Sequence, residues 1–420
     1  MKRIYSQQLN EEYYVQDLAS GFQVILYPKA ERYNKGAFLS VGYGSLDQEF
    51  IDDNGTVHHT PPGTAHFLEH KLFENSSSDI LEELGRLGAN VNAFTAYDNT
   101  CYDFTAPDNF EPSLELLLQL PFRREYTQSG VELERDIISR EIDIYLDSVD
   151  YRSYRNGLTA LYPHHPMGQD IAGSHESIKQ IDKRTLDLVM DNFYVPENMF
   201  LFLIGDFQPQ ELDQIVKSLP PFYHEYRPKA RVMIESDPSI PTSDSLIEFD
   251  DTPIPSFDYL LKLEPLDDPE EAFQRMIKYN LILDVLFGKG SDFFQANYTA
   301  GVLSDLDVEY HYGQGYCYIS FSAEGKKPEQ FKLNLEKLLA GFHETGVSME
   351  EVDRIKRKTM GRFLMGFNSI HNIAQTYIAF HYLKAHLFDY LETVNSIVLD
   401  DFQNLFQGAN VFSIVREETL

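Results

Sequence analysis

Apolar and polar residues follow two different periods along this chain, and the changes of period predict a mixture of strands and helices. Three short apolar runs are typical of strands: 21–26 (GFQVIL), 35–41 (KGAFLSV) and 199–204 (MFLFLI). Three stretches have the apolar spacing of helices: 65–73, 109–122 and 129–147. The aromatic- and threonine-containing segment 91–104 indicates a pair of strands. The first half is therefore predicted to be an α+β domain.

A similar order of elements recurs in the second half. A strand (FDYLLKL), a long helix (PEEAFQRMIKYNLILDVLF), another strand (YCYISFSA), further helices and a last strand (NVFSIV) follow one another. Such repetition indicates two copies of one α+β unit. We expect each copy to contain an antiparallel-rich sheet with helices packed on one face.

A proline-rich segment separates the two halves. Residues 220–255 contain seven of the 20 prolines of the chain. Proline fixes φ and lacks a backbone donor, which disfavours helices and central strands in this segment. We therefore expect an N-terminal domain (1–219), an extended linker (220–255) and a C-terminal domain of similar fold (256–420).

Composition limits the kind of molecule. The 420 residues are 43% hydrophobic, which is enough for more than one core and excludes a disordered chain. With 35 basic and 66 acidic residues the net charge is −31, which disfavours binding to nucleic acid or to anionic lipid. Two cysteines exclude a disulfide framework and indicate a reducing compartment. The N-terminus has no signal-peptide pattern and no apolar run is long enough for a membrane helix, so we expect a cytoplasmic protein.

The segment 64–73, TAHFLEHKLF, carries the strongest chemical signal. His66 and His70 lie four residues apart and share one face of the predicted helix. Two imidazoles placed in this way can hold a divalent metal such as zinc, and Glu69 can take a proton from water beside it. The order H-x-x-E-H is the inverzincin signature. The same pattern also arises by chance in helices whose histidines are solvated or belong to a core.

A zinc site needs a third protein ligand, and the helix predicted at 129–147 is the best source. Glu134 and Glu141 are seven residues apart, so they lie nearly above one another on one face. Ile137 and Ile138 lie on or near this face, and a carboxylate on a buried face needs a partner such as a metal. Ser129 and Glu132 form a capping-box pattern at the start of the helix.

Two further histidine pairs do not suggest a metal site. His58 and His59 precede two prolines, and His164 and His165 lie in the sequence YPHHP. We interpret both pairs as structural residues of loops.

Several motifs, taken in order, resemble the pitrilysin/insulinase-type family of zinc metallopeptidases, which includes enzymes like the mitochondrial processing peptidase. They are GTAHFLEHKLFE, GANVNAFTAYDNTCY, VELERDIISREIDIY and YPHHPMGQDIAGSHESI. The resemblance extends over essentially the whole chain and is strong in the first half. It implies that His66, His70 and Glu141 bind one zinc ion per chain and that Glu69 is the general base. The 71 positions between His70 and Glu141 are slightly fewer than is usual in the family.

The resemblance assigns two further sets of residues. Glu134 matches a second carboxylate of the family. This carboxylate contributes to catalysis from a position next to the zinc ligands but does not itself bind the zinc. Asn92, Ala93, Phe94 and Thr95 match the strand edge on which such enzymes bind an extended peptide by β-addition. An ordinary amide at a strand end explains Asn92 equally well.

The second half departs from the family pattern. Self-sufficient members carry an Arg and a Tyr there that contact the substrate carbonyl, but the matching segment 286–310 contains no arginine and has Lys289 as its only basic residue. Tyr298 and Tyr310 remain. Either this half has diverged, with Tyr310 as a core residue, or the arginine comes from another chain. The chain is similar to the zinc-bearing subunit of bacterial heterodimeric pairs, so we expect a related zinc-less partner, with a homodimer as the second choice.

Three functions remain in competition. The complete set of ligands and base favours a zinc endopeptidase for short or unfolded peptides. A non-catalytic scaffold subunit of the same fold is the alternative from a different class, although such subunits typically lose motif residues. A metal-dependent hydrolase of non-peptide substrates could use the same site, and the strand edge at 92–95 argues weakly against it.

Overall fold

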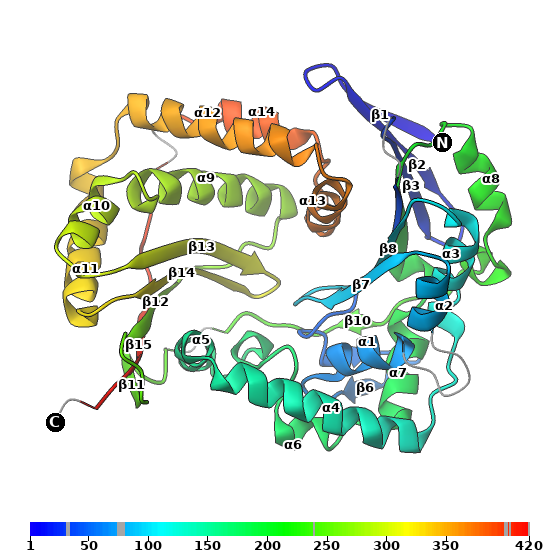
Figure 1. The fold of residues 1–420 in the computed structure, drawn as a ribbon, viewed down its shortest axis with the longest axis horizontal. Helices are drawn as coiled ribbons and strands as arrows, with labels where there is room; N and C mark the ends of the chain where they lie inside the picture. Colours follow the sequence, from blue (N-terminus) through cyan, green and yellow to red (C-terminus); the bar gives the residue numbers. More distant parts are fainter. Residues whose placement is uncertain (31–33, 74–79, 238–239, 399–401, 403–404, 419–420) are drawn as a thin grey trace. The chain divides into compact units, whose positions relative to one another are not determined.

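The computed structural model describes the chain from residue 1 to residue 418, except for five internal segments: 31–33, 74–79, 238–239, 399–401 and 403–404. The chain forms two compact units (Figure 1). Unit 1 contains Met1–Ile142, Asp170–Met233 and Gly366–Tyr382. Unit 2 contains Asp143–Gln169, Ile234–Met365 and Leu383–Leu420.

A seven-stranded sheet forms the centre of unit 1. Its strands in chain order are β1 (Lys2–Ser6), β2 (Glu11–Asp17), β3 (Gln23–Pro28), β4 (Lys35–Val41), β7 (Asn90–Thr95), β8 (Thr100–Ala106) and β9 (Met199–Gly205). Their order across the sheet is β1-β2-β3-β9-β4-β8-β7. Neighbours are antiparallel except for the parallel pair β3 and β9. The hairpin of β7 and β8 therefore ends the sheet, with β7 at its edge.

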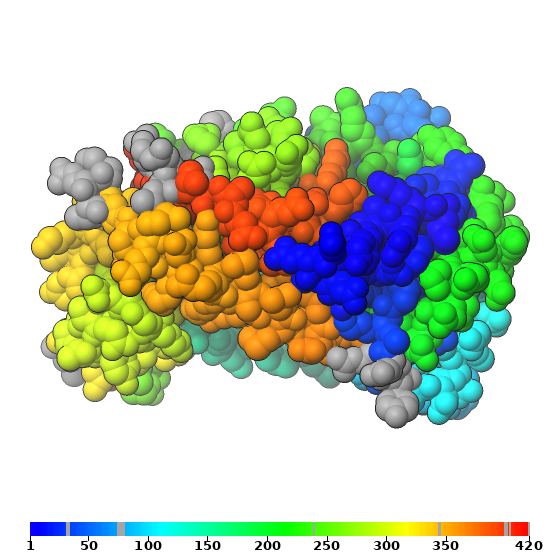
Figure 2. All heavy atoms as spheres, turned by 90° about the horizontal axis from the view of Figure 1, so that it is seen from above, coloured from blue at the N-terminus to red at the C-terminus, as the bar shows by residue number. Residues whose placement is uncertain are grey.

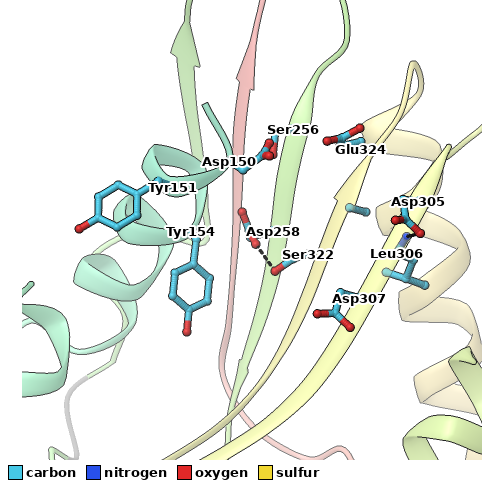
Figure 3. Close-up of a pocket in the computed structure, with 11 residues that line it drawn as sticks. Asp150, Tyr151, Tyr154, Ser256, Asp258, Asp305, Leu306, Asp307, Ser322 and Glu324 are labelled. Carbon is cyan, nitrogen blue, oxygen red and sulfur yellow. Dashed lines mark hydrogen bonds between the residues drawn. The ribbon is translucent and has the colours of Figure 1, made fainter. Parts of the chain in front are cut away.

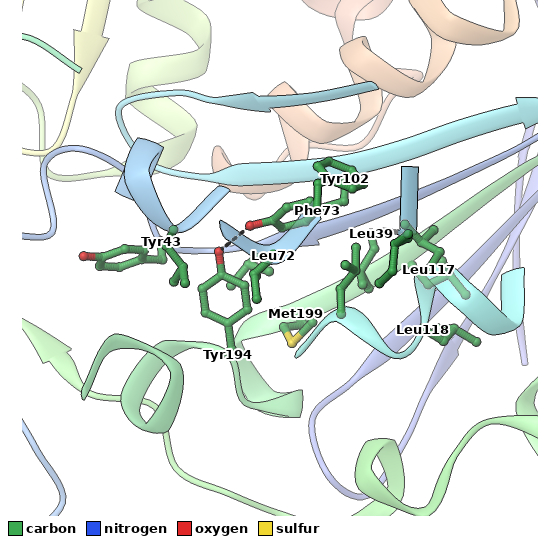
Figure 4. Close-up of a cluster of buried hydrophobic side chains, with 14 of the residues drawn as sticks. Leu39, Tyr43, Leu72, Phe73, Tyr102, Leu117, Leu118, Tyr194 and Met199 are labelled. Carbon is green, nitrogen blue, oxygen red and sulfur yellow. Dashed lines mark hydrogen bonds between the residues drawn. The ribbon is translucent and has the colours of Figure 1, made fainter. Parts of the chain in front are cut away.

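Most helices of unit 1 share one hydrophobic core with this sheet. They are α1 (Thr64–Phe73), α2 (Ile80–Arg86), α3 (Phe110–Leu117), α4 (Gln128–Asp147, which continues into unit 2), α6 (His175–Ile178), α7 (Lys183–Phe193) and α8 (Glu211–Ser218). Leu39 of β4, Leu72 of α1 and Tyr102 of β8 meet in the core between sheet and helices (Figure 4). The hydroxyl groups of Tyr102 and Tyr194 share a hydrogen bond of 2.8 Å there. This core holds α1 firmly against the sheet.

The opposite face of the same sheet is covered by α13 (Ile370–Tyr382), which comes from the second half of the chain. Tyr377 of α13 stacks on Phe202 of β9, with ring centroids 4.6 Å apart. The Tyr382 hydroxyl lies 2.7 Å from Ser40 Oγ on β4. Helices thus cover both faces of the sheet, and the prediction of helices on one face is corrected on this point. The apolar side chains of β4 and β9 point to both faces of the sheet, so both faces must be shielded from water.

Unit 2 contains a five-stranded sheet in the order β11-β15-β12-β14-β13. The strands are β11 (Ser245–Phe249), β12 (Ser256–Lys262), β13 (Asp305–Gly313), β14 (Tyr316–Glu324) and β15 (Asn410–Arg416). The helices are α5 (Val149–Leu161), α9 (Pro269–Phe287), α10 (Asp292–Thr299), α11 (Pro328–Thr345), α12 (Met349–Gly366) and α14 (Asp389–Ser396). Phe287 of α9 packs on Phe321 on one face, whereas Gly157 of α5 lies against Leu260 on the other.

The two sheets share one topology. Strands β3-β9-β4-β8-β7 of unit 1 correspond in chain order to β11-β15-β12-β14-β13 of unit 2. The parallel pair also corresponds, because β3 is parallel to β9 and β11 is parallel to β15. The predicted fold class, two similar α+β units with antiparallel-rich sheets, is confirmed.

The proline-rich segment contributes only edge strands to these sheets. β10 (Arg231–Val232) ends a three-stranded sheet with β5 (Glu49–Ile51) and β6 (Val57–His59), and β11 ends the sheet of unit 2. The chain passes from unit 1 to unit 2 after Met233, inside this segment. In contrast to the contiguous domains predicted from the sequence, however, the compact units exchange residues 143–169 and 366–382. Local sequence patterns carry no signal for this exchange, because it depends on tertiary packing.

Helices α12 and α14 lie side by side at the surface (Figures 1 and 2). Lys356 of α12 is buried there and donates to the backbone oxygen atoms of Asn395 and Ile397 at the end of α14.

Among the described residues, no helix combines the length and the apolar character needed to cross a bilayer.

Candidate metal centre

Helix α1 presents three functional side chains on one face. Ala65, Leu68 and Leu72 are buried at helical spacing in the core of unit 1. The other face therefore carries His66, Glu69 and His70 at positions i, i+3 and i+4.

The start of α1 is fixed by Gly63. Its φ is +90°, and an added Cβ atom would lie 2.6 Å from the carbonyl oxygen of Ala172. Only glycine combines this backbone conformation with such a close approach. The first turn then closes through Phe67, whose N–H donates to the Gly63 carbonyl oxygen over 2.9 Å.

Helix α4 lies beside α1 (Figure 1) and brings Glu134 and Glu141 to it. Val131, Ile138 and Ile142 are buried and hold the helix in place. The prediction that Ser129 caps the start of this helix is wrong, because the helix already begins at Gln128. Thr127 takes the capping role, since its Oγ1 accepts the N–H of Gly130 over 3.1 Å.

The predicted ligands converge on one point. Nε2 of His66 lies 3.6 Å from Oε1 of Glu141, and Nε2 of His70 lies 3.5 Å from Oε2 of the same residue. One ligand atom from each of the three residues lies within 4.8 Å of the others. Bonds of about 2.0–2.2 Å around a tetrahedral zinc ion place ligand atoms about 3.4 Å apart, so the donor set fits zinc. Within the described part of the chain, this is the only group of metal-ligating residues so placed.

The two imidazoles differ in their surroundings. Burial lowers the pKa of His66 to about 4, so this imidazole is neutral at neutral pH, as binding of a metal would require. Its Nδ1 is buried without a hydrogen-bond partner among the described residues. Burial also acts to lower the pKa of His70, but the hydrogen bond to Glu134 and nearby carboxylates raise it overall.

Glu134 lies beside the ligands and does not face the metal position. Its Oε1 accepts from His70 Nδ1 over 3.0 Å, and its Oε2 accepts from Lys71 Nζ over 2.9 Å. Carboxylates in this position fix the tautomer and orientation of a metal-binding histidine.

Glu69, the predicted general base, lies in largely buried surroundings. Burial raises its pKa above the usual value for a glutamate. Thr95 Oγ1, at the end of β7, donates a hydrogen bond of 2.5 Å to Glu69 Oε2. A carboxylate with a raised pKa is better suited to both accept and return a proton near neutral pH.

The four residues predicted to bind substrate all lie on β7, the edge strand of the sheet. Ala93, Phe94 and Thr95 are half-buried, whereas Asn92 is exposed. The Asn92 amide donates over 3.4 Å to Asp103 of β8, a carboxyl group whose pKa burial raises to about 7.

The other histidine pairs have structural surroundings. His58 lies on the short strand β6, not in a loop as predicted, because its segment pairs with β5. Its Nε2 lies 2.9 Å from Asp52 Oδ2. His165 is buried, and its Nδ1 accepts the N–H of Met167 over 3.0 Å.

Tyr310, in the second half of the chain, lies inside the fold. Tyr310 is only 8% exposed and lies in the core of unit 2, which leaves open whether another chain supplies the arginine. Its hydroxyl oxygen accepts from Arg275 Nε over 2.7 Å. Arg275 also donates to Cys317 Sγ over 3.0 Å. Lys289 pairs with Asp305, whereas Tyr298 is exposed.

Unit 2 also contains a pocket of about 430 Å³ between α5 and the sheet (Figure 3). Its lining includes Tyr151 and Tyr154 of α5 and five carboxyl groups, namely Asp150, Asp258, Asp305, Asp307 and Glu324. Asp258 accepts a hydrogen bond of 2.6 Å from Ser322, and burial raises its pKa to about 7. The lining residues include no imidazole or thiol, so this pocket does not resemble the zinc-type donor set of unit 1.

Comparison with known proteins identifies the family. Residues 53–175 match the sequence profile of the insulinase family (peptidase family M16), and residues 181–359 match the peptidase M16 inactive domain. Over 414 residues the chain is 30% identical to the uncharacterized zinc protease YmfH of Bacillus subtilis (strain 168), which covers 97% of this chain and 96% of YmfH. The chain belongs to the peptidase M16 family. The zinc-protease names of its M16 relatives support a metallopeptidase and a zinc cofactor.

Solved structures agree with this assignment. An M16-like peptidase from Alicyclobacillus acidocaldarius superimposes with a TM-score of 0.91 at 27% identity, over 97% of this chain and 99% of that one. A protease from Helicobacter pylori shares the fold, with a TM-score of 0.80 at 17% identity over 96% of this chain and 99% of that one.

Two contacts at this M16 site were not predicted from the sequence. In addition to its predicted contact with substrate, Thr95 donates a hydrogen bond from its hydroxyl group to Glu69. The sequence does carry a signal for the contact of Lys71, because a lysine on the buried side of an amphipathic helix indicates a buried charged partner.

Replacing Glu141 by Gln is expected to weaken zinc binding more than the roughly 10–100-fold that loss of an outer hydrogen-bond partner causes, because the variant loses a direct ligand. Metal content after dialysis and competition with a chromophoric chelator measure the effect. Glu132→Gln, an exposed substitution on the same helix, is the control. Full stoichiometric zinc in the Glu141 variant would show that the third ligand is wrongly assigned.

Proposed function

We propose that this M16 chain is the catalytic subunit of a zinc-dependent endopeptidase that cleaves short or unfolded peptides, with one zinc ion per chain. The observation that carries the proposal is the convergence of His66, His70 and Glu141 on one point with Glu69 beside them. Zinc held there would supply a Lewis acid that polarises the peptide carbonyl and makes water more acidic.

The substrate would bind as an additional strand on β7. This strand ends the sheet, so its outer backbone groups have no partner strand among the described residues. An extended peptide can pair with such an edge through its main chain, which suits unfolded substrates of varied sequence. Thr95 at the end of β7 contacts Glu69, so a peptide along this edge would pass the catalytic carboxylate.

Glu69 would carry the proton during hydrolysis. Its carboxylate accepts a proton from the attacking water and later delivers it to the nitrogen of the departing amine. The hydrogen bond from Thr95 holds Oε2, which leaves Oε1 to receive the proton. Burial raises the pKa of Glu69, and this makes the protonated form accessible during the cycle.

A non-catalytic scaffold of the same fold is the competing function. Both histidines, Glu69 and Glu141 are present, and the distances between the predicted ligand atoms fit a zinc ion. These two observations favour the enzyme. A scaffold has no need for a buried carboxylate held beside two metal-ligating imidazoles. Cleavage of a quenched peptide library that chelator abolishes and zinc restores distinguishes the two functions.

The substitution Glu69→Gln is expected to retain zinc and the ability to bind peptide, while turnover falls by about 10²–10⁴-fold, the usual contribution of a general base. Zinc content, peptide affinity and the rate of library cleavage are measured on one preparation. Glu115→Gln, at an exposed position of α3, controls for the loss of a carboxylate elsewhere. Joint loss of metal and activity would instead make Glu69 a ligand or a structural residue.

Peptides that carry Lys or Arg are expected to associate faster than matched acidic peptides. The net charge of −31 attracts cations over long range, and salt screens this attraction. The ratio of kcat/KM for two peptides of equal length and opposite charge is measured at low and at high ionic strength. A ratio of one at low salt contradicts the prediction, whereas a ratio that shrinks with salt supports it.

We further propose that a related chain without the zinc motif completes the active site. The segment 286–310 contains no arginine, and Tyr310 is held in the core by Arg275. A donor for the oxygen of the scissile carbonyl would then come from the partner, across a chamber that the two chains share.

The isolated chain is expected to bind zinc but to cleave peptides poorly, because it lacks a donor for the developing oxyanion. Loss of one such donor commonly lowers kcat by about 10²–10³-fold. Addition of the related zinc-less chain should therefore raise cleavage by about two orders of magnitude. Full activity of the isolated chain, unchanged by the related protein, would favour a self-sufficient enzyme.

A further inference from the structure

Lys71, which follows the ligand His70, is buried although its side chain is charged. Its side chain is 6% exposed and that of Glu134 only 1%. Lys71 Nζ donates to Glu134 Oε2 over 2.9 Å, and Glu134 Oε1 accepts from His70 Nδ1 over 3.0 Å. One carboxylate of α4 therefore contacts two successive residues of α1.

This arrangement determines the direction of the His70 ring. A carboxylate group rotates about its last bond unless both oxygen atoms are held. Lys71 holds Oε2, so that Oε1 of Glu134 faces Nδ1 of His70. The contact at Nδ1 in turn directs Nε2, which lies 3.5 Å from Oε2 of the third ligand, Glu141.

The position of Lys71 in the helix supports a specific role. It lies on the buried side of α1, between Leu68 and Leu72, where an apolar residue would be the usual choice. Burial of an ammonium group is unfavourable unless a carboxylate or several acceptors meet it. The contact with Glu134 meets this need, and it also links the lysine to the metal site.

We propose that Lys71 is a positioning residue of the zinc site, which orients His70 through Glu134 and thereby raises zinc affinity. The inference rests on the proposed zinc site and goes beyond it, because Lys71 itself is not a ligand. Its effect is on metal binding, so it can be measured on the isolated chain without a partner and without a peptide substrate.

The test compares four variants of the full chain. Lys71→Met keeps the length of the side chain and removes the donor, Glu134→Gln removes the carboxylate, and the third variant combines both. Lys356→Met is the matched control, because Lys356 is also buried but donates to backbone oxygen atoms in unit 2. Zinc affinity is measured by chelator competition, and the absorption spectrum of bound Co²⁺ reports the ligand geometry.

Lys71→Met is expected to weaken zinc binding by about 10-fold and to change the Co²⁺ spectrum. Glu134→Gln is expected to weaken zinc binding by about 10–100-fold. The combined variant should bind zinc as Glu134→Gln alone does, because Lys71 acts through that carboxylate. Lys356→Met should leave the zinc affinity and the Co²⁺ spectrum unchanged, whatever its effect on thermal stability.

Unchanged zinc affinity of folded Lys71→Met, or losses that simply add in the combined variant, would overturn the inference. If Lys71→Met does not fold, Lys71→Gln replaces it, since its polar amide is too short to reach Glu134 and the same loss is expected. Failure of the unchanged chain to bind zinc would overturn the proposed function as well. Normal binding by the unchanged chain together with an unaffected Lys71 variant would overturn only the role of Lys71.

Discussion

The buried carboxylate of Glu134 is the central contact of the candidate metal centre. It joins α1 to α4 by accepting hydrogen bonds from His70 and Lys71, and the predicted third ligand, Glu141, lies two helical turns further along α4. Removing one partner of a buried charge pair commonly destabilises a protein by about 3–5 kcal/mol. The two helices that carry the three predicted ligands are therefore held in register by a contact that is costly to break and lies outside the predicted ligand set.

The sheet provides the other constraint. Edge strand β7 ends at Thr95, whose hydroxyl group holds the Glu69 carboxylate of α1. The edge strand on which we propose that a peptide binds is thus connected to the proposed general base. Because the core packs α1 against β8, the distance between strand edge and metal position is set by core packing rather than by a loop. Rigid elements of this kind place catalytic groups more accurately than loops do.

Much of this arrangement follows from periods that a sequence displays. A four-residue spacing brings His66 and His70 to one helix face, and a seven-residue spacing does the same for Glu134 and Glu141. The hairpin of β7 and β8 and the repeated order of elements were also predictable. The contact of Lys71 with Glu134 was not, because it joins residues 63 positions apart whose pairing depends on how α1 meets α4. The exchange of 143–169 and 366–382 between the units has the same cause: which sheet a helix covers is decided by tertiary packing.

The repeat also shows how the two units differ at the position of the candidate metal centre. In chain order, α1 follows β4 and precedes the hairpin β7–β8, just as α9 follows β12 and precedes the hairpin β13–β14. At this position α1 presents His66, Glu69 and His70 on its open face. Helix α9 instead turns Arg275 toward its own hairpin, where the guanidinium group meets Tyr310 and Cys317. Equivalent helices of the repeat thus carry predicted metal-site residues in unit 1 and a packing arginine in unit 2. An arginine held in this packing contact is not available to a substrate carbonyl, which supports the proposal that a partner chain supplies this group.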